Sequence, residues 1–328
     1  MRIFPKSKPT SGVATSMRRW AGRLAPLMLL LSLAAEAKTD CYGSVCVEQR
    51  SGPGYTDLRG VNRNAFPVML KLGLQPGNMR ADSDVDVFLL PPGETVPLLR
   101  LSAENPAEPP SFRTRVSWAR GDASAVHDDS YVYALPYHPG LGFKVTQSYN
   151  GRFSHHDDAR YAIDFDMPEG TPVFAAREGR VVAVEDRFDE GGPHRKFEAL
   201  ANYVVIQHPD GTFGEYLHLQ AKGVKVKVGD LVQRGQQIGL SGNTGFSSGP
   251  HLHFMVAGAT EDGLRRSYPA RFRTSEGIVA ELQRGRSYRH MPDDLPNAGG
   301  VEGLADVIEA SRQPAAPGAA VEEGVGGG

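Results

Sequence analysis

Two histidines stand one residue apart in the apolar stretch SSGPHLHFMV, residues 247–256. If this stretch is an extended strand, side chains two residues apart point to the same face, about 6.6 Å from each other. At that spacing His251 and His253 can both ligate one metal ion, or one can ligate it while the other reaches a metal-bound water. Taken by itself, the stretch also allows a purely structural role for the pair.

Two further stretches supply groups of the same chemical kind. His218 lies in the strand-like EYLHLQ, and Asp164 lies in the His- and Asp-rich FSHHDDARYAIDFDMPEGTPV. Imidazole and carboxylate are common zinc ligands, and a catalytic zinc site typically keeps three protein ligands and a water. That water ionises near neutral pH, and nearby histidines can take its proton or stabilise an oxyanion. Each residue alone has an ordinary structural explanation, but their occurrence within one β-rich segment favours zinc-dependent hydrolysis.

A serine or cysteine nucleophile fits this chain less well. The two cysteines, Cys41 and Cys46, lie near the N-terminus, and no serine occupies a nucleophile-elbow sequence. In an exported chain this pair is expected to form a short disulfide loop.

Three stretches together resemble the lysostaphin/LytM-type zinc metalloendopeptidases: YAIDFDMPEGTPVFAAREGRV, YLHL and VKVGDLVQRGQQIGLSGNTGFSSGPHLHF. They occur in that family's order and cover residues of roughly 140–275. The resemblance implies a protease that uses one Zn²⁺ per chain to hydrolyse the peptide cross-links of bacterial peptidoglycan. The alternative is a catalytically degenerate module that binds the cell wall or activates another hydrolase.

The resemblance also implies roles for four of the residues named above. Asp164 and His253 match two zinc ligands of the family. His218 and His251 match the two histidines that are not ligands and act on water and the transition state. Which of these two is the general base stays open.

The first zinc ligand departs from the family's common pattern. That ligand usually lies four residues before the aspartate, where this chain has Arg160, which has no lone pair to donate. A longer form of the family resembles FSHHDDARYAIDF and implies His155 as the ligand, with His156 as its rival.

The elements that must position these residues are mainly β. Short apolar runs separated by Gly, Pro, Asn and Asp predict a small sandwich-like module and then a compact antiparallel β-sandwich peptidase domain. The expected organisation is a signal peptide over 1–37, an arm over 38–60 containing Cys41 and Cys46, an accessory β-rich module over 61–135, the zinc metallopeptidase domain over 136–275, and a largely disordered C-terminal extension over 276–328.

Composition and the N-terminal segment indicate where the protein acts. The formal charge of −2 gives no long-range attraction to nucleic acid or anionic membranes. The apolar run LAPLMLLLSLAA follows a basic segment and is too short to span a bilayer, which is typical of a signal peptide. We therefore expect an exported protein of the periplasm or cell envelope, without stable membrane insertion, whose partner is a peptidoglycan peptide. The sequence does not identify any regulatory protein partner.

Overall fold

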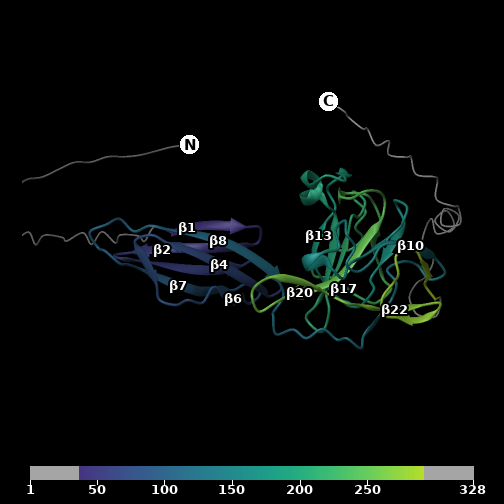
Figure 1. Cartoon of the computed structure of the whole chain (residues 1–328), viewed down its shortest axis with the longest axis horizontal. Helices are drawn as coiled ribbons and strands as arrows, with labels where there is room; N and C mark the ends of the chain where they lie inside the picture. Colours follow the sequence, from purple (N-terminus) through teal and green to yellow (C-terminus); the bar gives the residue numbers. More distant parts are fainter. Residues whose placement is uncertain (1–36, 292–328) are drawn as a thin grey trace, which may run out of the picture. The chain divides into compact units, whose positions relative to one another are not determined.

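A computed structural model of the chain describes residues 37–291, and apart from two short helices the regular elements of these residues are all β-strands. The predicted signal segment and the end of the predicted C-terminal extension lie outside the described residues. Figure 1 draws the earliest strands in purple and blue and the later ones in teal to yellow. No helix within the described residues has the length and apolarity needed to cross a bilayer.

The first part of the chain forms a five-stranded sheet, ordered β1-β2-β3-β7-β5, and a three-stranded sheet, ordered β6-β4-β8. Buried side chains of both sheets, such as Leu58 and Leu101 of one and Leu70 and Leu90 of the other, share one apolar cluster. This is the predicted sandwich. Its strands are β1 (Ala37–Tyr42), β2 (Val45–Gly52), β3 (Tyr55–Asn62), β4 (Val68–Pro76), β5 (Met79–Ala81), β6 (Val87–Leu90), β7 (Thr95–Ala103) and β8 (Phe112–Arg120).

The predicted loose arm over 38–60 is wrong, because these residues form β1, β2 and most of β3. Alternate residues of β3 are buried, and the charged side chains of Asp57 and Arg59 lie on its outward face. Gly43 and Gly54 have φ angles of 70° and 78°, the left-handed conformation that tight turns require. The predicted disulfide is confirmed, since Cys41 and Cys46 pair across β1 and β2 and are joined.

The second part is built on a nine-stranded sheet, ordered β17-β13-β15-β16-β20-β11-β10-β24, with β21 paired to β20. Small sheets of β12-β18, β14-β19 and β23-β22-β9 complete it. Its elements are β9 (Val132–Tyr133), β10 (Gly142–Gln147), η1 (Asp157–Ala159), β11 (Ile163–Phe165), β12 (Pro172–Phe174), β13 (Gly179–Glu185), β14 (Gly191–Gly192), η2 (Arg195–Leu200), β15 (Tyr203–Gln207), β16 (Phe213–Leu217), β17 (Leu231–Val232), β18 (Gln237–Leu240), β19 (Gly245–Phe246), β20 (Leu252–Ala259), β21 (Arg265–Tyr268), β22 (Arg271–Thr274), β23 (Gly277–Val279) and β24 (Ser287–Arg289).

Strand pairing shifts both predicted limits of this second domain. Tyr133 and Leu135 are fully buried in its core, and β9 pairs with β22, so the domain begins before residue 136. At the other end, β23 continues a hairpin from β22, and β24 pairs with β10. The predicted limit at 275 therefore cuts through the hairpin of β22 and β23.

Candidate metal and catalytic centre

Four neighbouring strands bring the candidate residues together at one register. Gln147 on β10 pairs with Asp164 on β11, and Asp164 pairs with His253 on β20. His253 also pairs with Leu217 on β16, and His218 follows directly after that strand. Residues far apart in the sequence thus form one row across the sheet.

The strand that carries His253 is buried on both faces. Leu252, Phe254 and Val256 point into the main apolar core, while Met255 lies in a small cluster on the opposite face. Because side chains alternate along a strand, His253 shares the face of Met255 and points away from the main core. Hydrophobic packing of alternate residues therefore fixes the direction of the histidine.

The structure brings His155 into the site and leaves its rival outside. His155 is fully buried, and its Nε2 atom lies 3.0 Å from Asp164 Oδ1. His156 is exposed and contacts Asp157 at 2.9 Å. Arg160 is also exposed, and its Nε atom donates to the Asp157 carbonyl. The segment between His155 and Asp164 contains the short helix η1.

Asp164 lies at the centre of a buried group of three residues. One ligand atom each from His155, Asp164 and His253 all lie within 4.8 Å of one another, and His253 Nδ1 is 2.9 Å from Asp164 Oδ1. Burial alone would raise the pKa of Asp164, but its hydrogen bonds with His155 and His253 hold that pKa well below its usual range. Burial lowers the pKa of His253 despite its contact with the carboxylate.

This donor set fits a zinc ion. His155 Nδ1 lies 3.0 Å from the Ser148 carbonyl, which only accepts, so Nδ1 carries a proton. A neutral His155 then presents only a lone pair at Nε2, facing the Asp164 carboxylate. A positive charge, either a proton or a metal ion, must lie between two such electron-pair donors. Two imidazoles and one carboxylate, all buried, match the three protein ligands of a catalytic zinc site.

His218 and His251 lie beside this group with similarly fixed rings. Their ring centres are 4.6 Å apart, and His251 Nε2 lies 3.7 Å from Asp164 Oδ1. His218 Nδ1 donates to the Thr244 carbonyl at 2.7 Å, and His251 Nδ1 donates to the Gly249 carbonyl at 2.7 Å. In the neutral form each ring therefore keeps its lone pair on Nε2. His251 and His253 thus both approach Asp164 Oδ1, at 3.7 Å and 2.9 Å.

The backbone and burial of His218 are unusual. Its φ angle is 65°, in the left-handed region that few non-glycine residues occupy, directly after β16. Burial, with charge on the neighbouring histidines, lowers the pKa of His218 to about 3. The imidazole is therefore neutral near pH 7.

Gln147 belongs to the site but was missed by the sequence analysis. Its Nε2 atom donates to Asp164 Oδ2 and to Ser154 Oγ, both at 2.9 Å. Its Oε1 atom accepts from the amides of Phe153 and Ser154. One side chain thus orients the carboxylate and shapes the loop leading to His155. The alternation of FKVTQ gives no signal for it, because the pairing of β10 with β11 shifts register between Val145 and Gln147.

Comparison with known proteins places this site within a family segment. Residues 158–263 match Peptidase family M23, a range that contains Asp164, His218, His251 and His253 but begins after His155. Peptidoglycan DD-endopeptidase ShyA of Vibrio cholerae is 38% identical over 133 residues, covering 39% of this chain and 28% of ShyA. Lysostaphin of Staphylococcus simulans is 35% identical over 133 residues, covering 40% of this chain and 24% of lysostaphin.

A solved structure of lysostaphin from the same organism aligns at 32% identity, over 38% of this chain and 47% of that chain, with a TM-score of 0.29. This chain thus matches only about a quarter of the length of the two relatives, 28% and 24%. Within the matched segment, the predicted resemblance to lysostaphin-type peptidases is confirmed.

The two adjacent histidines provide a matched test of the first ligand. We expect His155→Ala to lower zinc affinity by more than about 100-fold, beyond the effect usual for outer-shell partners. His156→Ala should leave that affinity unchanged, because its side chain is exposed and turned to Asp157. Competition with a chromogenic chelator measures both. If His156→Ala loses zinc and His155→Ala keeps it, the first ligand is His156 and not His155.

The amide of Gln147 should matter to the metal site without touching the metal. Gln147→Leu removes the donor to Asp164 Oδ2 and the acceptor for two loop amides. We expect zinc affinity to fall by about 10- to 100-fold, the usual effect of losing an outer-shell partner. Gln233→Leu, at an exposed glutamine outside this network, is the control. An affinity equal to that of the control would contradict the role given to Gln147.

Proposed function

We propose that this protein is an exported zinc endopeptidase that hydrolyses peptide cross-links of bacterial peptidoglycan. The observation that carries the proposal is the grouping of His155, Asp164 and His253 around one buried point, with the Nε2 sides of His218 and His251 beside it. The match to Peptidase family M23 and the names of the relatives support the substrate class.

Three residues hold the metal in this proposal. His155 comes from a loop, whereas Asp164 and His253 come from two paired strands whose register sets the spacing of these two residues. When bound, a zinc ion lowers the pKa of a coordinated water and polarises a carbonyl group. The Asp164 carboxylate offsets part of the ion's charge and leaves the site cationic.

Two residues handle protons in this proposal. The Nδ1 atoms of His218 and His251 donate hydrogen bonds to backbone carbonyls. Each ring therefore offers the lone pair of Nε2 to the substrate. One takes the proton of the attacking water, and the other stabilises the developing oxyanion or protonates the leaving amine. Their symmetric anchoring leaves the assignment between them open.

Digestion of purified cross-linked muropeptides by the intact chain tests the activity. We expect cleavage of dimers into monomers, with one water added per bond, when zinc is bound. A chelator should abolish cleavage and added zinc should restore it, because the residues alone lack the Lewis acid. Mass spectrometry of the products measures the outcome and identifies the bond.

The variant His251→Ala separates catalysis from metal binding. It should keep one zinc per chain and reduce kcat by at least about 100-fold, the usual contribution of a general acid or base. If the zinc-loaded parent chain cleaves no muropeptide, the proposed activity is wrong and a wall-binding module takes its place. If His251→Ala loses its zinc, the division between ligands and proton-transfer residues is wrong.

A further inference from the structure

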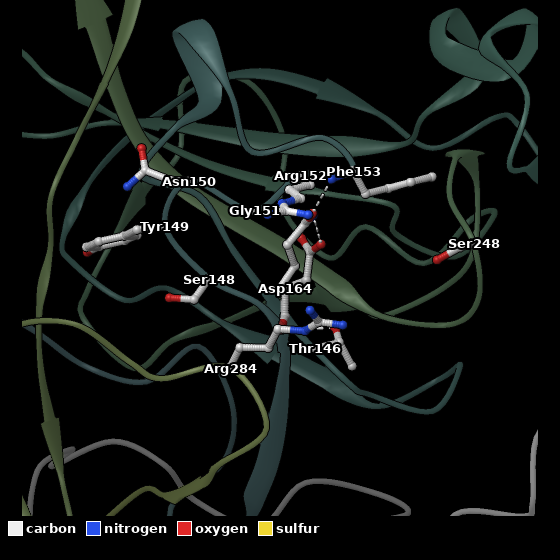
Figure 2. A pocket seen from close by; sticks show the side chains of 11 residues that line it. Thr146, Ser148, Tyr149, Asn150, Gly151, Arg152, Phe153, Asp164, Ser248 and Arg284 are labelled. Carbon is white, nitrogen blue, oxygen red and sulfur yellow. Dashed lines mark hydrogen bonds between the residues drawn. The ribbon is translucent and has the colours of Figure 1, made fainter.

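A groove of about 760 Å³ opens beside the metal ligands. The end of β10, the loop over residues 148–153, Ser248 and Arg284 line it, and Asp164 forms part of its wall. In the view of Figure 2, Asp164 lies between Arg152 and Arg284. A peptide whose scissile bond lies at the metal centre would therefore extend along these two arginines.

The two arginines carry charge that the protein itself does not neutralise. Both are exposed, and neither guanidinium has a hydrogen bond or ion pair with any residue in the range 37–291. The neighbouring Arg286, in contrast, pairs with Glu276 at 2.8 Å. The Asp164 carboxylate in the wall already contacts His155 and His253. It is therefore not available as a partner for either arginine.

Hydrogen bonds fix the backbone on both sides of the groove. On the Arg284 side, the amide of Gly285 donates to Val145, and Ser148 Oγ donates to the Leu282 carbonyl at 2.5 Å. On the Arg152 side, Gln147 Oε1 accepts from the amide of Phe153 at 3.0 Å. Both arginines thus project from anchored backbone and not from free loops.

The far edge of the groove is apolar. Phe153 lines the groove and stacks on Phe246 of β19, with ring centres 5.0 Å apart. A ligand that suits this groove therefore combines a negative group for the arginines with small apolar side chains. An extended peptide bearing a free carboxylate has this combination.

We propose that Arg152 and Arg284 form a specificity subsite for a carboxylate of the peptide substrate, close to the scissile bond. The inference rests on the endopeptidase function proposed above and adds the charge of its preferred substrate. A guanidinium presents paired N–H groups that match both oxygens of a carboxylate. A carboxamide has the same shape but lacks the charge, so it should be a poorer substrate.

Two matched cross-linked peptides test the subsite, one with the free acid and one with the carboxamide at the residue flanking the scissile bond. We expect the zinc-loaded parent chain to favour the acid by about tenfold or more in kcat/KM, mainly through KM. Arg152→Gln and Arg284→Gln should each reduce this ratio, and the double variant should bring it near one. Arg271→Gln, at an exposed arginine of β22 outside the groove, should keep the parent ratio.

A binding measurement separates failure of the subsite from failure of the proposed function. The zinc-loaded His251→Ala chain, alone and combined with Arg284→Gln, is titrated calorimetrically with both peptides. The His251→Ala chain should bind the acid more tightly than the amide, and adding Arg284→Gln should reduce this difference in affinity. Equal cleavage and equal binding of acid and amide by chains with both arginines would overturn the subsite and leave the endopeptidase intact. No cleavage of either peptide by the parent would overturn the function, and the binding ratio would then decide the subsite alone.

Discussion

The contact of one buried carboxylate with two histidines is the interaction on which the rest of the site depends. Asp164 Oδ1 lies 3.0 Å from His155 Nε2 and 2.9 Å from His253 Nδ1. A carboxylate buried in this way is costly unless positive charge or hydrogen-bond donors compensate it. Gln147 satisfies the other oxygen, so the histidine side of the carboxylate is left for a cation. The strand register, the loop that carries His155 and the proposed metal site all depend on this group.

Backbone carbonyls fix the ring orientation and the tautomer of three histidines around that group. His155, His218 and His251 each place Nδ1 against a carbonyl oxygen, of Ser148, Thr244 and Gly249 respectively. The ring nitrogen that remains is then fixed by the fold, since a carbonyl can only accept. This arrangement prepares the lone pairs before any metal or substrate binds. In the proposed mechanism, the same anchoring lets one histidine bind the metal and two others transfer protons.

The sequence drew attention to Asp164 and His253 because both lie in short strands with a regular apolar pattern. The period of two predicted that His251 and His253 share one side, and the resemblance to a longer form of the family implied His155, with His156 as its rival. Contacts that no local pattern encodes were missed. Gln147 gains its role only through pairing of β10 with β11, and Arg284 faces the groove only because its segment is anchored on β10. The arm over 38–60 was misjudged because outward polar residues of paired strands resemble those of a loop.

A crystal structure of the zinc-loaded chain, with anomalous data at the zinc edge, tests the central arrangement most directly. We expect one anomalous peak, ligated by His155 Nε2, one oxygen of Asp164 and His253 Nδ1 at about 2.0–2.2 Å, the distances usual for zinc. His218 and His251 should not ligate the zinc, and their Nδ1 atoms should still donate hydrogen bonds to the Thr244 and Gly249 carbonyls. A peak ligated by His218, His251 or His156, or no bound zinc at this centre, would contradict it.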